Sequence, residues 1–404
     1  MQEDVLTAQL EKVTQQYIKK SKLFRNSGYD LSWLLENNQF FWPAYQTINL
    51  TGNTFFEKLS NMYFGKKNLF KKKIINKICY KLNEGYFTPL KEREIHIDNS
   101  DFIIFWNQLS IHLNQYWSVI HHWTYTELFS FLTAYTSVFC TYLNLNNNFY
   151  KKDKILQNQF GRTSYIEIRS LFIQDKLPLK YLLYLVVKSN WIDNYNFDPS
   201  HFILSFSEEI NDILDQASWV AELIDSNPLF HFKALENDIH SQVKTFLYEC
   251  DNSGEIYFDL VLIEYLLLNG HNVIVSLKKH AILNDITYQE FKSILKTNDA
   301  QHLSKYVNNG TLSLVENDTR DVVCLRYLVN EAYKEAYKKS NIIILKGQGH
   351  FESYPKIFIS ERKKTPILYK NTHYHLFGVK SEHTLKSMQS IHKYVELNQF
   401  VLLR

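Results

Sequence analysis

The stretch from Val243 to Asp259, VKTFLYECDNSGEIYFD, constrains the fold more than any other part of this 404-residue chain. Its first half is a nearly continuous run of apolar and aromatic residues, which is typical of a strand buried on both faces, as in a parallel sheet. Residues 251–254, Asp-Asn-Ser-Gly, favour a turn and a helix N-cap. A helix with one apolar face is then predicted. That face carries Ile256, Leu260, Ile263 and Leu267.

Asp251 and Asn252 therefore lie where a buried strand ends and a helix begins. Open α/β sheets bind ligands at this edge, and carboxylate and amide oxygens are hard ligands suited to a divalent cation. The alternative is that the two side chains only cap the helix. This stretch alone does not separate a metal site from a helix cap.

Length and composition indicate a globular, two-domain protein. Hydrophobic residues make up 45% of the chain and aromatic residues 15%, and the net charge of +3 gives no reason to expect nucleic acid or a membrane as partner. The four cysteines show no metal-site or disulfide spacing and are interpreted as buried thiols in a reducing compartment. With no secretory signal and no run of eighteen apolar residues, we expect a cytoplasmic protein. The oligomeric state stays open.

Residues 1–240 are predicted to form a mainly helical N-terminal region. Apolar stripes recur at helical spacing, one of them at residues 5–17 and another at residues 55–63. The lysine run at residues 66–73 is interpreted as a solvated helix face, and His121-His122 as packing or surface residues, because adjacent helical side chains point in different directions. Residues 182–193, LLYLVVKSNWID, read as an apolar helix that ends at Ser189-Asn190.

Residues 241–404 are predicted to form an α/β domain with a mostly parallel, Rossmann-like sheet flanked by helices. Strand and helix patterns alternate along this half of the chain, which is typical of βα units. The strands are expected at 243–250, 271–277, 311–315, 341–345 and 373–379, and the helices at 253–268, 287–296 and 325–339.

Polar groups follow four of these strands. They are Asp251 with Asn252, Asn284 with Asp285, Lys346 with a Gly-x-Gly loop, and Lys380. The carboxyl ends of parallel strands share one edge, so distant residues can converge there. Two carboxylates and an amide suit Mg²⁺ or Mn²⁺, a glycine-rich loop can cradle an anion, and lysines neutralise phosphoryl charge. Together they indicate phosphoryl transfer. Each feature alone has a structural alternative, in which the glycine loop is an ordinary turn and Asp285 only starts a helix.

Several sequence blocks resemble those of the damage-control phosphatase family, which is also described as having an acidic-residue methyltransferase-like metal-binding domain. The blocks are DNSGEIYFD at 251–259, LNDIT at 283–287, KGQGHFE at 346–352 and SNWIDNYNF at 189–197, followed by the late strand that ends in Lys380. The chain departs from the family's pattern at several positions, which include Ser381, where a cysteine often follows the lysine. Phe377-Gly378-Val379 precedes Lys380 where one branch of the family has an Arg-Thr pair, and His350 stands where asparagine is usual.

The resemblance implies a divalent-metal-dependent phosphatase acting on small phosphorylated metabolites, often sugar phosphates. It implies Asp251, Asn252 and Asp285 as ligands of one cation, Mg²⁺ or Mn²⁺, with cobalt or nickel as alternatives. Lys346 would act on the phosphoryl group. The implied substrate contacts are Asn190, Glu255, Lys346, Gly347, Gln348, Gly349 and Lys380. The alternatives are a binder of a phosphorylated or nucleotide-sugar ligand without turnover, and the family's contested carboxyl methyltransferase activity. No glycine-rich loop for S-adenosylmethionine follows the first strand.

Overall fold

The computed structural model describes residues 2–26, 99–120, 125–143, 150–193, 199–215, 219–317, 319, 324–326, 328–353, 370–389 and 392–404. The predicted stripe at residues 55–63, the lysine run at 66–73 and His121-His122 lie outside these ranges.

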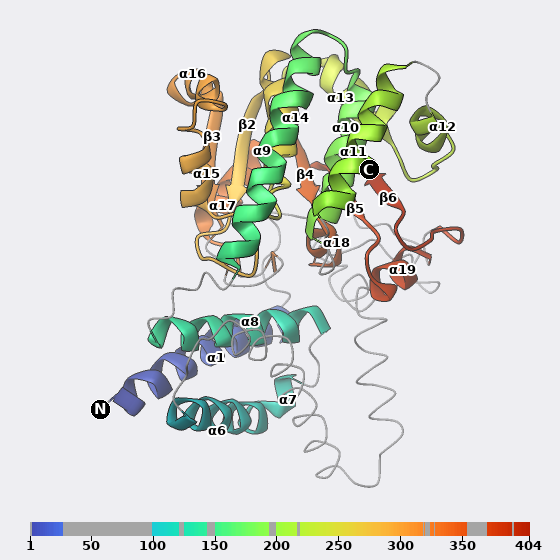
Figure 1. Ribbon diagram of the computed structural model, residues 1–404. Helices are drawn as coiled ribbons and strands as arrows, with labels where there is room; N and C mark the ends of the chain where they lie inside the picture. The colour runs from blue at the N-terminus through green and yellow to red at the C-terminus, as the bar shows by residue number, and fades with distance from the viewer. Residues whose placement is uncertain are drawn as a thin grey trace.

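A six-stranded sheet confirms the predicted α/β fold (Figure 1). Every neighbouring pair is parallel except the last, which is antiparallel and adds an edge strand that the sequence patterns did not predict. In spatial order the strands are β3 (Leu312–Glu316), β2 (Asn272–Leu277), β1 (Thr245–Glu249), β4 (Ile342–Lys346), β5 (Thr372–Gly378) and β6 (Phe400–Leu403).

The strand order reverses direction between β1 and β4. From β1 the chain adds β2 and β3 on one side, and it then returns to add β4 and β5 on the other side. Such a switch point leaves a crevice outside the carboxyl ends of the two central strands, where open α/β sheets bind ligands. Glu249 pairs with Leu345, so the residues that follow β1 and β4 lie at the same level of the sheet.

Both faces of the central strands are buried, which explains their continuous apolar sequence. Phe246 and Tyr248 of β1 face one hydrophobic core, and Leu247 between them faces the other. The first core contains α9 (Lys151–Ile173), α10 (Leu179–Lys188), α11 (Pro199–Leu214), α12 (Trp219–Asp225), α13 (Phe232–Ser241) and α14 (Ile256–Leu268). The second contains α1 (Gln2–Asn26), α6 (Asn99–Gln115), α7 (Trp117–Ile120), α8 (Tyr125–Tyr142) and α17 (Glu331–Lys339).

Helices α9 to α13 precede residue 241, yet they share one hydrophobic core with β1, β2 and α14. Helix α14 is apolar around almost its whole circumference because α9 and α10 cover the sides that do not face the sheet. Figure 1 shows α1, α6 and α8 grouped below the sheet, and their apolar side chains share the second core with β1 and β4. The division into residues 1–240 and 241–404 stays a prediction about domain organisation.

Three local predictions need correction. The helix predicted from residue 325 begins only at Glu331, because the Asn330 side chain accepts a hydrogen bond from the Tyr333 amide and caps it there. The Gly-x-Gly segment is not a loop throughout, since Gln348 already starts α18 (Gln348–Ser353). Asp285 does not directly follow a strand, because β2 ends at Leu277. The remaining short elements are η3 (Ser189–Asp193), α15 (Tyr288–Ile294), η4 (Gln301–Leu303), α16 (Ser304–Asn308) and α19 (Glu382–Gln389).

The helices that the structure describes include none with both the length and the apolar character needed to cross a bilayer.

His373 in β5 makes folding sensitive to acid. It is buried with its Nε2 3.2 Å from the Tyr337 hydroxyl, and burial together with the charge of Arg326 lowers the pKa of His373 to about 3. Between pH values of about 3 and 6.5, this histidine is protonated in the unfolded chain and neutral in the folded chain. The free energy of unfolding is therefore unaffected by His373 above this window and decreases as pH falls through it. We expect His373 to contribute a loss of about 2–3 kcal/mol at a pH of about 4.5. Urea unfolding at neutral and acidic pH should show a smaller acid-induced loss in His373→Gln than in the wild type, and equal losses would contradict this assignment.

Candidate active site

Helix α9 holds the loop that joins β1 to α14. Gly254 has a φ of +79° in this loop, and its amide donates to Asn158 Oδ1 at 2.8 Å. A Cβ atom on Gly161 of α9 would lie 2.2 Å from the Gly254 carbonyl oxygen, so glycine is required for the helix to approach this closely. The helix therefore determines the path of the chain immediately after Asp251 and Asn252.

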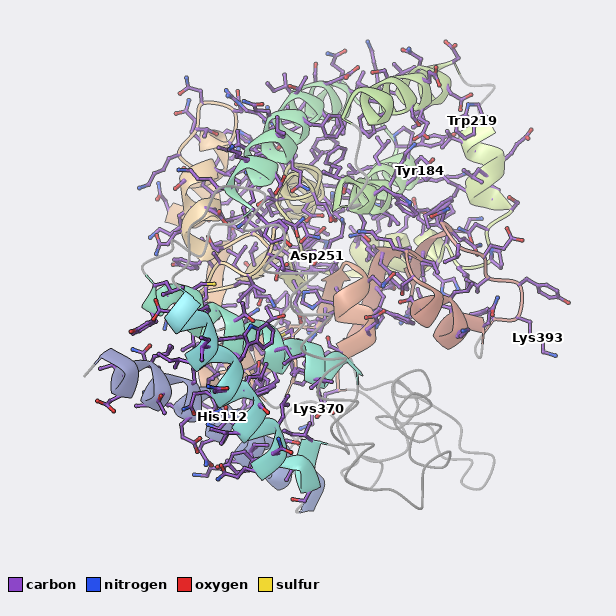
Figure 2. The ribbon with its side chains drawn as sticks, turned by 60° about the horizontal axis from the view of Figure 1, so that its bottom comes forward. His112, Tyr184, Trp219, Asp251, Lys370 and Lys393 are labelled. Carbon is purple, nitrogen blue, oxygen red and sulfur yellow. The ribbon has the colours of Figure 1, made fainter. Side chains whose placement is uncertain are left out.

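Asp251 and Gly347 meet across the switch point between β1 and β4. A Cβ atom on Gly347 would lie 1.7 Å from Asp251 Oδ2, and Gly347 has a φ of +90°. The Asp251 carboxylate is partly exposed and accepts a hydrogen bond from Asn190 Nδ2 at 3.2 Å. The glycine of the predicted phosphate loop thus makes room for the predicted metal ligand. Figure 2 shows Asp251 between the part of the chain around His112 and the part around Tyr184.

The loop that carries Asp285 folds back onto the loop that carries Asp251. Asn252 and Asp285 form an antiparallel β-bridge, and the Ile286 amide donates to the Asp251 carbonyl at 3.0 Å. The Ser253 amide donates to the Asn284 carbonyl at 2.9 Å. These backbone contacts bring the three predicted metal ligands next to one another, although the second loop is reached well after β2 has ended.

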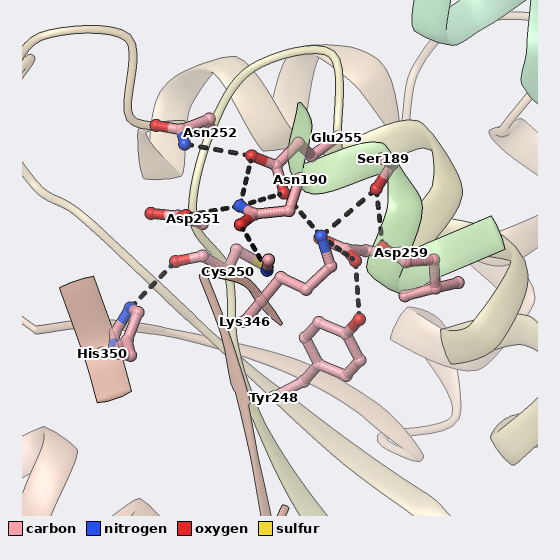
Figure 3. A network of polar contacts seen from close by, with 12 residues as sticks. Ser189, Asn190, Tyr248, Cys250, Asp251, Asn252, Glu255, Asp259, Lys346 and His350 are labelled. Carbon is pink, nitrogen blue, oxygen red and sulfur yellow. Dashed lines mark hydrogen bonds and ion pairs between the residues drawn. The ribbon is translucent and has the colours of Figure 1, made fainter. Parts of the chain in front are cut away.

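Glu255 lies at the centre of a buried hydrogen-bond network (Figure 3). Its two carboxylate oxygens each accept from Asn190 Nδ2 at 3.0 Å, and one of them also accepts from Asn252 Nδ2 at 3.0 Å. The side-chain Oδ1 of Asn190 accepts from the Gly378 amide at 3.1 Å. Glu255 and Asn190 are both fully buried. The structure therefore places them behind the strand edge, where they orient Asn252 and Asp251.

Lys346 belongs to the same interior network. Its fully buried ammonium lies 2.5 Å from Glu255 Oε2, 3.2 Å from Ser189 Oγ and 3.8 Å from Asp259 Oδ1. Burial alone would lower the pKa of Lys346, but Asp259 and Glu255 raise it above its ordinary value. Burial raises the pKa of Asp259 to about 6, although its Oδ1 accepts from the Tyr248 hydroxyl at 2.7 Å. The sequence analysis assigned no role to Ser189, which begins the SNWIDNYNF block, or to Tyr248, which lies within the first strand.

Gln348 connects the start of α18 to the end of β5. Its Oε1 accepts from the Lys380 amide at 2.8 Å, and its Nε2 donates to Glu352 and to Ser381. The Gly347 amide donates to the Leu376 carbonyl at 2.8 Å, so this N–H is part of the sheet. Gly349 lies inside α18, and the Lys380 side chain is partly exposed. These residues lie on the β4–β5 side of the switch point.

Two buried lysines that sequence reasoning missed contact Asp285. Lys278 Nζ lies 3.5 Å from Asp285 Oδ2. Lys154 Nζ, on α9, donates to the Asp285 carbonyl at 2.7 Å and to both Glu290 oxygens at 3.0 Å. Lys278 directly follows β2, so the rule that selected the other strand ends would have selected it. Lys154 lies far away in sequence and carried no such signal.

The side chains present fit a divalent cation. The described residues contain no cluster of three His, Cys, Asp or Glu side chains arranged around one point, but the predicted set uses two carboxylates and an amide, which are oxygen donors of the kind that Mg²⁺ and Mn²⁺ prefer. Within the described network the four carboxylates outnumber the two ammonium groups. These carboxylates belong to Asp251, Glu255, Asp259 and Asp285, and the ammonium groups to Lys278 and Lys346. A divalent cation held by Asp251 and Asp285 would add positive charge beside these carboxylates, which favours their burial.

A cavity of about 580 Å³ lies on the other side of η3. Trp191 lines it together with Tyr184 and Phe400, and none of the predicted metal ligands does. A Cβ atom on Gly378 would lie 2.3 Å from the Trp191 ring, so η3 packs directly on the end of β5 between this cavity and the site.

An open, mostly parallel sheet with acidic side chains at its switch point defines a Rossmann-like α/β domain, a class of fold in which ligands bind at this edge. The model of the damage-control phosphatase ARMT1-like domain matches residues 8–388. The chain therefore belongs to the damage-control phosphatase ARMT1-like family, as the sequence blocks indicated.

Two curated relatives match part of the chain. Damage-control phosphatase PH1575 from Pyrococcus horikoshii is 31% identical over 185 residues, which cover 45% of this chain and 55% of the relative. The uncharacterized protein MJ0202 from Methanocaldococcus jannaschii is 29% identical over 139 residues, or 34% of this chain and 41% of the relative. The chain thus matches about half the length of each.

The crystal structure of a DUF89 family protein, PH1575 from Pyrococcus horikoshii, is similar with a TM-score of 0.51 and 20% sequence identity. The match covers 76% of this chain and 98% of that chain. At this level of identity the likeness shows a shared fold.

Proposed function

We propose that this protein is a divalent-metal-dependent phosphatase that hydrolyses small, sugar-phosphate-like metabolites. The observation that carries the proposal is the convergence of Asp251, Asn252 and Asp285 beside Gly347 at the switch point of the sheet. Family membership and the name of the relative PH1575 support a phosphatase. Phosphoryl transfer depends chiefly on positioning and on charge stabilisation, and this edge offers oxygen donors with cations behind them.

In this proposal Asp251, Asn252 and Asp285 would hold Mg²⁺ or Mn²⁺, with cobalt or nickel as alternatives. When bound, the cation supplies Lewis-acid polarisation of the phosphoryl group. Glu255 and Asn190 orient Asn252 and Asp251 through the hydrogen bonds described above.

Lys346 has a supporting role in this proposal, because it neutralises the carboxylates beneath the site. Lys380, partly exposed at the end of β5, is the proposed contact to the rest of the substrate.

A second candidate is ligand binding without turnover. The engaged position of Lys346 favours it, because an ammonium held by Glu255 and Ser189 is not directed at a reacting phosphoryl group. In this candidate the same edge binds a phosphorylated or nucleotide-sugar ligand and releases it unchanged.

Metal-supplemented hydrolysis separates the two candidates. The full chain, freed of metal with chelator, would be supplied in turn with Mg²⁺, Mn²⁺, Co²⁺ or Ni²⁺ and a panel of phosphomonoesters, and released phosphate would be measured. We expect release with at least one metal and its loss in excess chelator. Thermal stabilisation by the same esters without phosphate release would support the binder, and full activity in excess chelator would contradict a metal mechanism.

A further inference from the structure

Lys278 is a buried cation at the strand edge. Lys278 directly follows β2, the neighbour of β1, and is only 3% exposed. The Tyr288 amide donates to its carbonyl at 2.8 Å, and Lys278 forms a parallel β-bridge with Thr287. Its backbone is therefore held between β2 and the start of α15, and its side chain extends toward the loop that carries Asp285.

The ammonium of Lys278 touches a predicted metal ligand. Its Nζ lies 3.5 Å from Asp285 Oδ2, which is an ion pair longer than the usual hydrogen bond of a charged pair. Lys346 differs in this respect, since it lies 2.5 Å from Glu255 and also contacts Ser189. Of these two buried lysines, Lys278 is the one that contacts Asp285, a carboxylate proposed to hold the metal ion.

A phosphorylated substrate needs a cation besides the metal. A phosphomonoester carries a charge of roughly −2, and the two carboxylates of Asp251 and Asp285 would already offset the charge of a divalent ion. Lysine places a compact ammonium on a flexible four-carbon stem, so it can change partners by rotation of its side chain. A metal ion at Asp285 would compete with Lys278 for the same carboxylate and release the ammonium toward the incoming phosphoryl group.

We propose that Lys278 neutralises Asp285 in the metal-free protein and contacts the phosphoryl group once a divalent cation binds. This inference rests on the proposed phosphatase site and adds its phosphate-binding cation. The proposal requires that one substitution change two affinities in opposite directions. Removing the ammonium should raise the affinity for the metal, because a competitor is lost, and lower the affinity for phosphate, because a contact is lost.

Binding measurements on the full chain test the proposal. Isothermal titration would give the Kd of Mn²⁺ for the metal-free protein and the Kd of inorganic phosphate for the Mn²⁺-loaded protein. In Lys278→Met we expect Mn²⁺ to bind about threefold or more tightly, and phosphate to bind more weakly by on the order of tenfold or more, the scale of one charge-assisted hydrogen bond. Lys278→Arg, which keeps the charge, should restore most of the phosphate affinity.

Lys154→Met is the matched control, because Lys154 is equally buried and contacts the Asp285 backbone. Loosening this loop should weaken the binding of both Mn²⁺ and phosphate. If Lys278→Met also weakens both, or leaves phosphate affinity unchanged, Lys278 is a structural residue and the proposal is wrong. A different outcome would separate this inference from the proposed function. If the variants change the two affinities as expected but the wild type hydrolyses no ester, the proposed hydrolysis is wrong and the role of Lys278 is supported.

Discussion

Replacing Asp285 by alanine is expected to abolish metal-dependent phosphate release while leaving the fold intact. The substitution removes one of two carboxylates proposed to hold the cation, and a bound metal contributes several kcal/mol of charge stabilisation. A loss on the order of a thousandfold in kcat/KM follows from about 4 kcal/mol. The fold should survive because the contacts that hold this loop are made by its backbone: the bridge to Asn252 and the carbonyl bond to Lys154.

The measurements are steady-state kinetics with saturating Mn²⁺ and circular dichroism of the same sample. Asp225→Ala is the control, since the Asp225 side chain is 62% exposed and pairs with Lys180 at the surface. We expect its kinetics and its unfolding to match the wild type closely. If Asp285→Ala retains activity within tenfold of the wild type, this carboxylate does not hold a catalytic metal.

Replacing Lys346 by methionine is expected to reduce both stability and turnover. The substitution removes the ammonium that lies between Glu255 and Asp259, so two fully buried carboxylates lose their positive neighbour. Breaking a buried pair in this way typically costs about 3–5 kcal/mol. Glu255 would also lose a partner that keeps it aligned with Asn190 and Asn252, and we expect a fall in kcat on the order of a hundredfold.

Urea unfolding together with kinetics separates this role from direct contact with phosphate. A lysine that only contacts the substrate would change kinetics and leave unfolding nearly unchanged, so stability equal to the wild type would contradict the interior role. Lys338→Met is the control, because the Lys338 side chain is 47% exposed and pairs with exposed Glu335. A double variant that adds Glu255→Gln to Lys346→Met should recover part of the lost stability, since it removes one of the uncompensated charges.

The sequence predicted the fold class because the buried strands of a parallel sheet have a local signature. Five of the six strands were anticipated from apolar runs followed by turn residues. The sixth, β6, is a short antiparallel edge strand at the end of the chain. It was missed because short apolar runs occur in many settings and only pairing with β5 makes this one a strand.

The position of the candidate site could be predicted for a different reason. The carboxyl ends of parallel strands share one edge, so Asp251 and Lys346 were expected at the same edge once the strands were recognised, and the strand order then made them neighbours. What each residue touches could not be predicted in the same way. Lys346 was expected to meet phosphate, and only the structure shows its ammonium enclosed by Glu255, Ser189 and Asp259.

By itself the sequence determined the parallel α/β architecture, the family and the residues at the strand ends, because apolar periodicity, turn chemistry and motif spacing are local properties of the chain. Tertiary structure alone decided which charges face one another. Lys154 meets the Asp285 loop from a helix 131 residues earlier in the chain, and Gly161 of that helix lets it approach Gly254. Such contacts arise from the close packing of distant elements, and the burial that this packing produces is what turns a lysine at the end of a strand into an interior counter-charge.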